Sequence, residues 1–174
     1  MGKRSTKENK NIYQTSREAM NLTREKASEL LETISADRIE KIENEKSAPH
    51  PDEILRMAEC YRNPKICNYF CSKECPIGNE YVPEIEIKDL SQITLELLAT
   101  LNSIEKDKER LIEITVDGKI TEDEYVNFVA IQDKLEQISI TVESLQLWVE
   151  RAIANEHIDR DKLEAIRKNL HSSN

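Results

Sequence analysis

Two short stretches that each follow a hydroxyl residue constrain the fold of this chain more than any other feature. Thr23 precedes residues 24–31, and Ser35 precedes residues 36–43. A threonine or serine at such a position caps a helix, because its side-chain oxygen accepts a hydrogen bond from a free backbone N–H of the first turn. The pattern therefore predicts two short helices joined by a tight turn at residues 32–34.

Three more helices are expected around this pair, which gives five in the first 70 residues. A first helix is expected over residues 8–20 or from Asn11 onward. A fourth starts at Pro51, because proline suits the first helical position, and the Asn63-Pro64 pair breaks it. A short fifth helix follows near residues 65–70 or slightly beyond. The apolar residues expected in these five helices are Ile12, Ala19, Met20, Ala27, Leu30, Leu31, Ile39, Ile42, Ile54, Leu55, Met57, Ala58 and Tyr61.

This region resembles the Cro and lambda-repressor-like helix-turn-helix family, also called the xenobiotic response element family. Residues 22–31 follow the family pattern Leu-Thr-x-x-x-Ala-x-x-Leu, and residues 35–43 follow Ser-x-x-x-Ile-x-x-Ile-Glu. Pro49 and the segment 55–58 also fit the fourth-helix pattern. The resemblance covers residues 8–70, and core positions, caps and spacing agree together. It implies a five-helix DNA-binding domain, with residues 36–43 as the recognition helix in the major groove.

The resemblance also implies which residues contact DNA. The two capping hydroxyls and their neighbouring backbone N–H groups suit phosphates, and an arginine on the recognition helix suits guanine. Arg24 starts the second helix, where it is expected to contact a phosphate or a base. Lys41 is expected to contact a phosphate. The full set of expected DNA-binding residues is Thr23, Arg24, Ser35, Ala36, Asp37, Arg38 and Lys41.

The sequence departs from the family pattern at two glycine positions. The turn between the paired helices has no glycine, so Thr33 or its neighbour must take the bend. After the recognition helix, Asn44-Glu45 replaces the common glycine, and Asn44 is expected to adopt the left-handed conformation there.

Three carboxylates of the recognition helix favour a second interpretation. Asp37, Glu40 and Glu43 give this helix an acidic character that phosphates repel. The alternative to a transcriptional regulator is therefore a non-enzymatic protein-interaction module that keeps the fold without specific DNA binding.

Charge divides the chain into two halves. Residues 1–83 carry 14 Lys and Arg against 14 Asp and Glu, and residues 84–174 carry 11 against 20, so the net charge of -9 belongs to the second half. Any nucleic-acid contact is therefore expected in the first half. No apolar run is long enough to span a bilayer, and the partly basic arm at residues 1–10 is not a secretory signal, so a cytoplasmic protein is expected.

Four cysteines within 16 residues, Cys60, Cys67, Cys71 and Cys75, are candidates for a metal site. Four thiolates suit zinc or an iron–sulfur cluster. Their spacing contains no Cys-x-x-Cys pair, however, and the last three fall along one face of a helix. Reduced, partly buried thiols are the alternative, with a disulfide as a third. No metal or cofactor is therefore assigned.

The second half is expected to be an antiparallel helical hairpin after a connector at residues 71–86, whose apolar residues should pack down. Long helices are predicted over residues 87–114 and 122–153, the second starting at the capping box Thr121–Glu124, with a last helix from Asp159 to Leu170. The fold class is thus all-α, with domains at 1–70 and 87–174. The apolar stripes are too wide for a lone hairpin, so this half is expected to form a homodimer; the alternative is a monomer in which the hairpin covers the first half.

No catalytic pattern is present in the sequence. His50, His157 and His171 are isolated from one another, and no glycine loop suits a phosphate, so the chain is not expected to be an enzyme. The Asp117-Gly118 pair with Glu124 partly fits a calcium loop, but Glu113 and Thr115 do not fit its first ligand positions. A plain turn at residues 116–119 is the expected structure.

Overall fold

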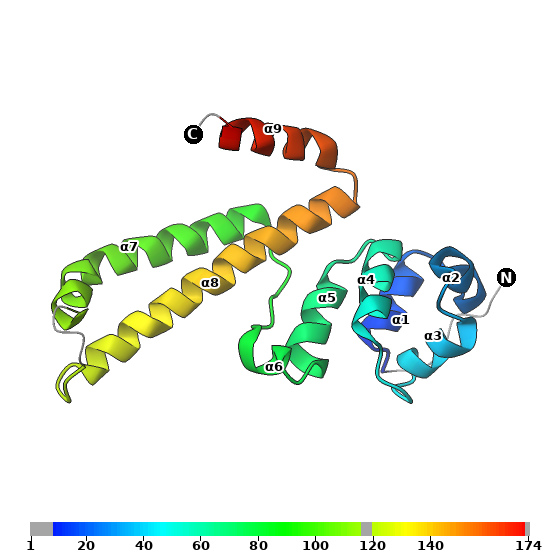
Figure 1. Ribbon diagram of the computed structural model, residues 1–174, viewed down its shortest axis with the longest axis horizontal. Helices are drawn as coiled ribbons and strands as arrows, with labels where there is room; N and C mark the ends of the chain where they lie inside the picture. The colour runs from blue at the N-terminus through cyan, green and yellow to red at the C-terminus, as the bar shows by residue number, and fades with distance from the viewer. Residues whose placement is uncertain (1–8, 116–119, 173–174) are drawn as a thin grey trace. The chain divides into compact units, whose positions relative to one another are not determined.

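The computed structural model describes residues 9–115 and 120–172 of the chain, and every regular element in them is a helix (Figure 1). The predicted all-α class is therefore confirmed. The described residues divide into two compact units: Ile85–Trp148, and the residues before Ile85 together with those from Val149 onward. Within the described part, no helix is long and apolar enough to cross a membrane. Most of the expected N-terminal arm, the turn at 116–119 and the calcium-loop positions within it lie outside the described residues.

The first unit begins with five helices whose bounds lie within a few residues of those expected. They are α1 (Ile12–Ala19), α2 (Arg24–Leu31), α3 (Ala36–Glu43), α4 (Pro51–Cys60) and α5 (Lys65–Tyr69). The Asn11 side chain caps α1 by accepting from the backbone N–H of Gln14 at 3.1 Å. Pro51 starts α4. Local chemistry therefore accounts for where α1 and α4 start.

Charged residues take the left-handed turns where glycine was missing. Glu32 has φ 56°, so the neighbour of Thr33 takes the bend between α2 and α3. The expectation for Asn44 was wrong: its φ is -96°, and Glu45 has φ 57°. Asn44 is still part of the helix end, because its backbone N–H donates to the carbonyl of Glu40. The next two N–H groups, of Glu45 and Lys46, then close the helix on the carbonyls of Ile42 and Lys41.

A single hydrophobic core joins α1 to α5. Its buried residues are Tyr13, Ala27, Leu31, Ile34, Ile39, Ile42, Ile54, Met57, Ala58, Tyr61, Ile66 and Phe70. Three of the apolar residues expected in these helices are exposed, namely Ala19, Leu30 and Leu55. Leu30 and Leu55 each adjoin a buried residue, Leu31 and Ile54, but point about 100° away from it, beyond the side of the helix that packs on the core.

A π-helical turn and a short helix follow α5. The π-helical turn η1 (Phe70–Glu74) continues α5, and α6 (Gly78–Tyr81) packs against it. Gly78 is buried, and α6 packs so closely here that a Cβ at this position would overlap the carbonyl oxygen of Cys71 and lie 2.8 Å from its carbonyl carbon. The apolar residues of this connector pack down only in part. Ile85 is buried, whereas Ile77 and Tyr81 are exposed.

The second unit contains two long antiparallel helices, α7 (Leu90–Thr115) and the greater part of α8 (Tyr125–Ala154) (Figure 1). Helix α7 starts three residues later than expected because the Asp89 carboxylate accepts from the backbone N–H of Gln92 at 2.9 Å and so caps it there. The capping-box residues Thr121 and Glu124 do contact each other, at 3.0 Å. They belong to a turn that precedes α8.

The last described helix is α9 (Arg160–Ser172), which belongs to the first unit. The Asp159 carboxylate caps it, as expected, by accepting from the backbone N–H of Lys162 at 3.1 Å.

Candidate DNA-contacting face and its support

The two capping hydroxyls are used inside the protein. Thr23 Oγ1 accepts from the backbone N–H of Lys26 at 3.2 Å, and Ser35 Oγ accepts from that of Arg38 at 3.2 Å. Each hydroxyl therefore fixes the start of its helix. One such bond leaves other N–H groups of a first turn without intrahelical partners, and such donors suit an anion. At the start of α2, the Glu25 carboxylate already accepts from its own backbone N–H and from Thr23.

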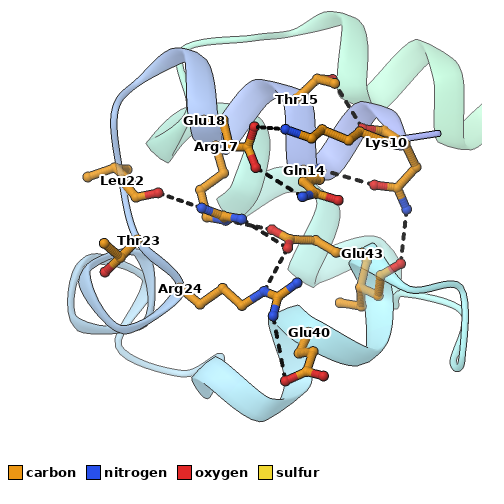
Figure 2. Close-up of polar contacts among 12 residues, drawn as sticks. Lys10, Gln14, Thr15, Arg17, Glu18, Leu22, Thr23, Arg24, Glu40 and Glu43 are labelled. Atoms are coloured by element: carbon orange, nitrogen blue, oxygen red, sulfur yellow. Dashed lines mark hydrogen bonds and ion pairs between the residues drawn. The ribbon is translucent and has the colours of Figure 1, made fainter. Parts of the chain in front are cut away.

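A buried ion pair connects α1 to α3 (Figure 2). The Arg17 guanidinium donates from Nε and Nη2 to the two carboxylate oxygens of Glu43, at 2.5 and 3.0 Å, and from Nη1 to the carbonyl of Leu22 at 2.5 Å. The Glu43 side chain is only 1% exposed. Burial acts to lower the pKa of Arg17, but the hydrogen bond and charge of Glu43 outweigh it and the pKa is raised. Arg17 therefore stays charged.

Arg24 joins the same ion-pair network from the start of α2. Its Nε donates to Glu43 at 2.8 Å, and its Nη1 lies 3.6 Å from a carboxylate oxygen of Glu40 (Figure 2). The Arg24 side chain is 27% exposed, so it lies at the edge of the network. Glu43 thus accepts from two arginines, and the three helices α1, α2 and α3 are connected through one carboxylate.

Arg38 lies in a different environment, facing the loop between α3 and α4. Its Nε and Nη2 donate to the two carboxylate oxygens of Glu53 at 2.7 and 2.6 Å. Its Nη1 donates to Ser47 Oγ at 2.5 Å, and Nη2 also donates to the carbonyl of Ala48 at 2.9 Å. Every guanidinium nitrogen therefore has a partner within the protein. A bidentate contact to guanine would require Arg38 to leave Glu53.

The outward side of α3 carries the remaining expected residues. Lys41 Nζ lies 2.7 Å from a carboxylate oxygen of Asp37, one turn earlier, and the two side chains are 51% and 74% exposed. Ala36 is half-buried. An exposed pair of this kind contributes little to stability and exchanges partners easily. Lys41 is therefore available to a phosphate, whereas the carboxylate partners of Arg24 and Arg38, Glu43 and Glu53, are themselves largely buried.

We expect the Arg38–Glu53 pair to make stability fall in acid. The hydrogen bond from Arg38 lowers the pKa of Glu53, although burial opposes this. The carboxylate stays ionised at a lower pH in the folded state than in the unfolded state. The ionised Glu53 carboxylate therefore makes its full contribution to the free energy of unfolding above the ordinary glutamate pKa, about 4.3. That contribution is lost as the pH falls through the lowered pKa of Glu53 in the folded state. Urea unfolding at a series of pH values should show a shallower acid slope for Glu53→Gln than for the wild type.

The control for this measurement is Asp52→Asn, which removes an exposed carboxylate from the same turn of α4. Equal acid slopes for Glu53→Gln and the wild type would show that the Arg38–Glu53 pair makes no pH-dependent contribution.

The four cysteines are partly buried free thiols packed against the core of the first unit. The expected alignment of Cys67, Cys71 and Cys75 on one helix face is interrupted, because η1 has a wider turn and Cys75 lies beyond it in extended backbone. Burial raises the pKa of the Cys60 and Cys67 thiols. The described residues, which include all four cysteines, contain no group of three or more Cys, His, Asp or Glu side chains that could hold a metal ion.

The residues that support this face were not found from the sequence. The expected inward side of α1 was apolar, but the helix buries Gln14, Ser16 and Arg17 with Tyr13. Glu53 was not singled out either. Arg17 and Glu43 are 26 residues apart and Arg38 and Glu53 are 15 apart, so no local spacing reveals the pairs.

Comparison with protein-family models finds no matching family, and comparisons with curated proteins and with solved structures find no significant match.

Proposed function

We propose that the first unit is a helix-turn-helix domain of the Cro and lambda-repressor-like kind and that the protein is a sequence-specific, DNA-binding transcriptional regulator. The observation that carries the proposal is the pair α2 and α3, each capped by a hydroxyl and joined by a tight turn. The Arg17–Glu43–Arg24 network fixes this pair against α1. A rigid pair of this kind can place its second helix in a major groove.

In this proposal the expected residues make two kinds of contact, with phosphates and with base edges. The first turns of α2 and α3, starting at Thr23 and Ser35, offer backbone N–H groups to phosphates. Lys41 contacts a phosphate, and Ala36 and Asp37 approach base edges, where a carboxylate suits the amino group of cytosine. Arg24 contacts the DNA backbone from its place at the edge of the Arg17–Glu43–Arg24 network.

We assign Arg38 a positioning role, because its guanidinium holds the loop after α3 through Ser47 and Ala48.

In this proposal the protein has no enzymatic activity, lies in the cytoplasm and forms a homodimer through its second half. Two copies of the reading head would then contact two half-sites of a palindromic operator.

The test is selection from a random duplex pool at low salt, followed by anisotropy titration of the winning duplex across a salt series. Recovery of a motif whose binding weakens steeply with salt would support a specific regulator. If the folded protein enriches no sequence and binds no duplex, the proposal fails.

Replacing Lys41 by alanine is expected to weaken binding to the selected duplex. Loss of a phosphate contact should reduce affinity for all sequences alike and lower the salt slope by about 1, whereas loss of a base contact should cost about 1–3 kcal/mol and relax specificity at one position. The matched control is Lys162→Ala, because Lys162 is also exposed and also lies near an aspartate, the Asp159 that caps its own helix. Equal binding by the two variants would remove Lys41 from the DNA-contacting face.

The exposed carboxylates of α3 favour a second candidate function, a protein-interaction module that keeps this fold. Asp37 and Glu40 both reach solvent, and an anionic surface repels DNA. The selection experiment separates the two functions, because this candidate predicts no enriched duplex at any salt concentration.

A further inference from the structure

Charge is distributed unevenly along the second unit. Residues 85–148 carry 14 Asp and Glu against 6 Lys and Arg, a net charge of -8. Residues 90–104 of α7 nevertheless contain one charged residue, Glu96, and residues 137–148 of α8 also contain one, Glu143. In contrast, seven of the eleven residues 105–115 are charged. These two charge-poor segments, the proximal segments, belong to antiparallel helices, at the end of the unit where α7 begins (Figure 1).

The proximal segments also expose large apolar side chains. Leu98 and Leu101 lie one turn apart on α7 and are 52% and 45% exposed. The exposed set in the proximal segments is Leu90, Leu95, Leu98, Leu101 and Val142. Singly exposed apolar residues are ordinary, but several on neighbouring turns with almost no charge between them mark an interaction surface. Ile93, Thr141 and Leu147 are buried, so this surface adjoins the internal packing of the unit.

The charge pattern identifies what this surface fits. A basic partner would be drawn to carboxylates, but these are concentrated outside the proximal segments. Two copies of a unit with net charge -8 repel each other unless they meet where charge is scarce. The proximal segments meet this condition, because each copy brings only Glu96 and Glu143 to the contact.

The size of the surface also suits a second copy. Two helices each about 10 Å across and about 20 Å long present roughly 400 Å² in projection, and the accessible surface of ridged helices is larger. An interface of this kind buries on the order of 1,000 Å² in total, which is the low end for specific association. The resulting dimer should dissociate on dilution.

We propose that the proximal segments, residues 90–104 and 137–148, are the seam through which two copies of this chain dimerise. In a two-fold arrangement the same surface is used on both copies, so Leu98 and Leu101 of one copy pack against the proximal segments of the other. This inference rests on the proposed function, because a regulator that reads two DNA half-sites must be a dimer. The seam is the contact that would hold that dimer together.

The test is sedimentation velocity of the full chain without DNA over a concentration series. The wild type, with a chain mass of 20.2 kDa, should sediment as a dimer at high concentration and as a monomer on dilution. The double variant Leu98→Glu, Leu101→Glu should stay monomeric at the highest concentration. The matched control is Ile112→Glu, Val126→Glu, two exposed apolar residues outside the proximal segments, which should dimerise as the wild type does.

Hydrogen exchange of the wild type provides a measurement that needs no substitution. Residues 90–104 and 137–148 should gain protection as concentration rises, whereas residues 105–115 should not. The proposed seam would be refuted if the wild type were monomeric at every concentration, or if the two double variants had the same oligomeric state. Sedimentation does not depend on DNA, so a dimer that binds no duplex would refute the proposed function and leave the seam standing.

Discussion

Replacing Glu43 by alanine is expected to cost about 3–5 kcal/mol of the free energy of unfolding, because it leaves a buried charge without its partner. Arg17 is buried beside Glu43 and would keep only the Leu22 carbonyl as an acceptor. Water cannot readily solvate a guanidinium in that position, and its charge is strongly retained. Equilibrium unfolding in urea, read by far-ultraviolet circular dichroism, measures the loss.

Two further variants separate the buried charge from the contacts it makes. Arg24→Ala removes the second donor to Glu43 from the edge of the network and should cost much less, because the Arg17–Glu43 pair remains. Arg17→Met with Glu43→Leu replaces both charges by apolar groups and should recover most of the stability. If Glu43→Ala were no more destabilising than Arg24→Ala, Glu43 would not be the buried centre of this network.

The helix starts could be predicted from the sequence because capping is local. Thr23, Ser35 and Asp159 each sit directly before a helix and accept a backbone N–H three residues later. The start of α7 was predicted three residues too early, and there too a local cap determines the start, because Asp89 directly precedes the helix. Such signals need no knowledge of distant residues.

The inward side of α1 could not be predicted in the same way. Periodicity arguments place apolar residues inside and charged ones outside, but α1 buries Arg17 and Gln14 while Ala19 is exposed. A buried arginine is stable only with a partner, and Glu43 belongs to another helix. The pattern within α1 therefore contains no sign of the pair.

The candidate site shows the same limit. Arg38 occupies a position at which the family resemblance implies a base contact, and Lys41 follows one turn later. The resemblance does not include Glu53, whose carboxylate accepts from Arg38 and changes what that arginine is free to do. Position on a helix was predictable, whereas the availability of the side chain depended on a tertiary contact.

The close packing of Gly78 against Cys71 gives the second large prediction. Gly78→Ala is expected to cost about 1–3 kcal/mol, the usual range for overpacking, or more. The added Cβ would overlap the carbonyl oxygen of Cys71, which is backbone and cannot move aside as a side chain can. Separating α6 from η1 would also disturb Glu74, which accepts from Tyr13 Oη at 2.9 Å and so ties η1 to α1.

The sign of this effect makes the Gly78→Ala measurement decisive. Alanine favours a helix over glycine by up to about 1 kcal/mol, so propensity alone predicts that the variant is more stable. Steric overlap with Cys71 predicts the opposite. The control is Asn79→Ala, an exposed position on the same short helix, which should change stability by less than about 0.5 kcal/mol. Thermal unfolding of the three proteins measures both changes. A Gly78→Ala variant that melts at or above the wild-type temperature would mean that α6 does not pack closely on η1.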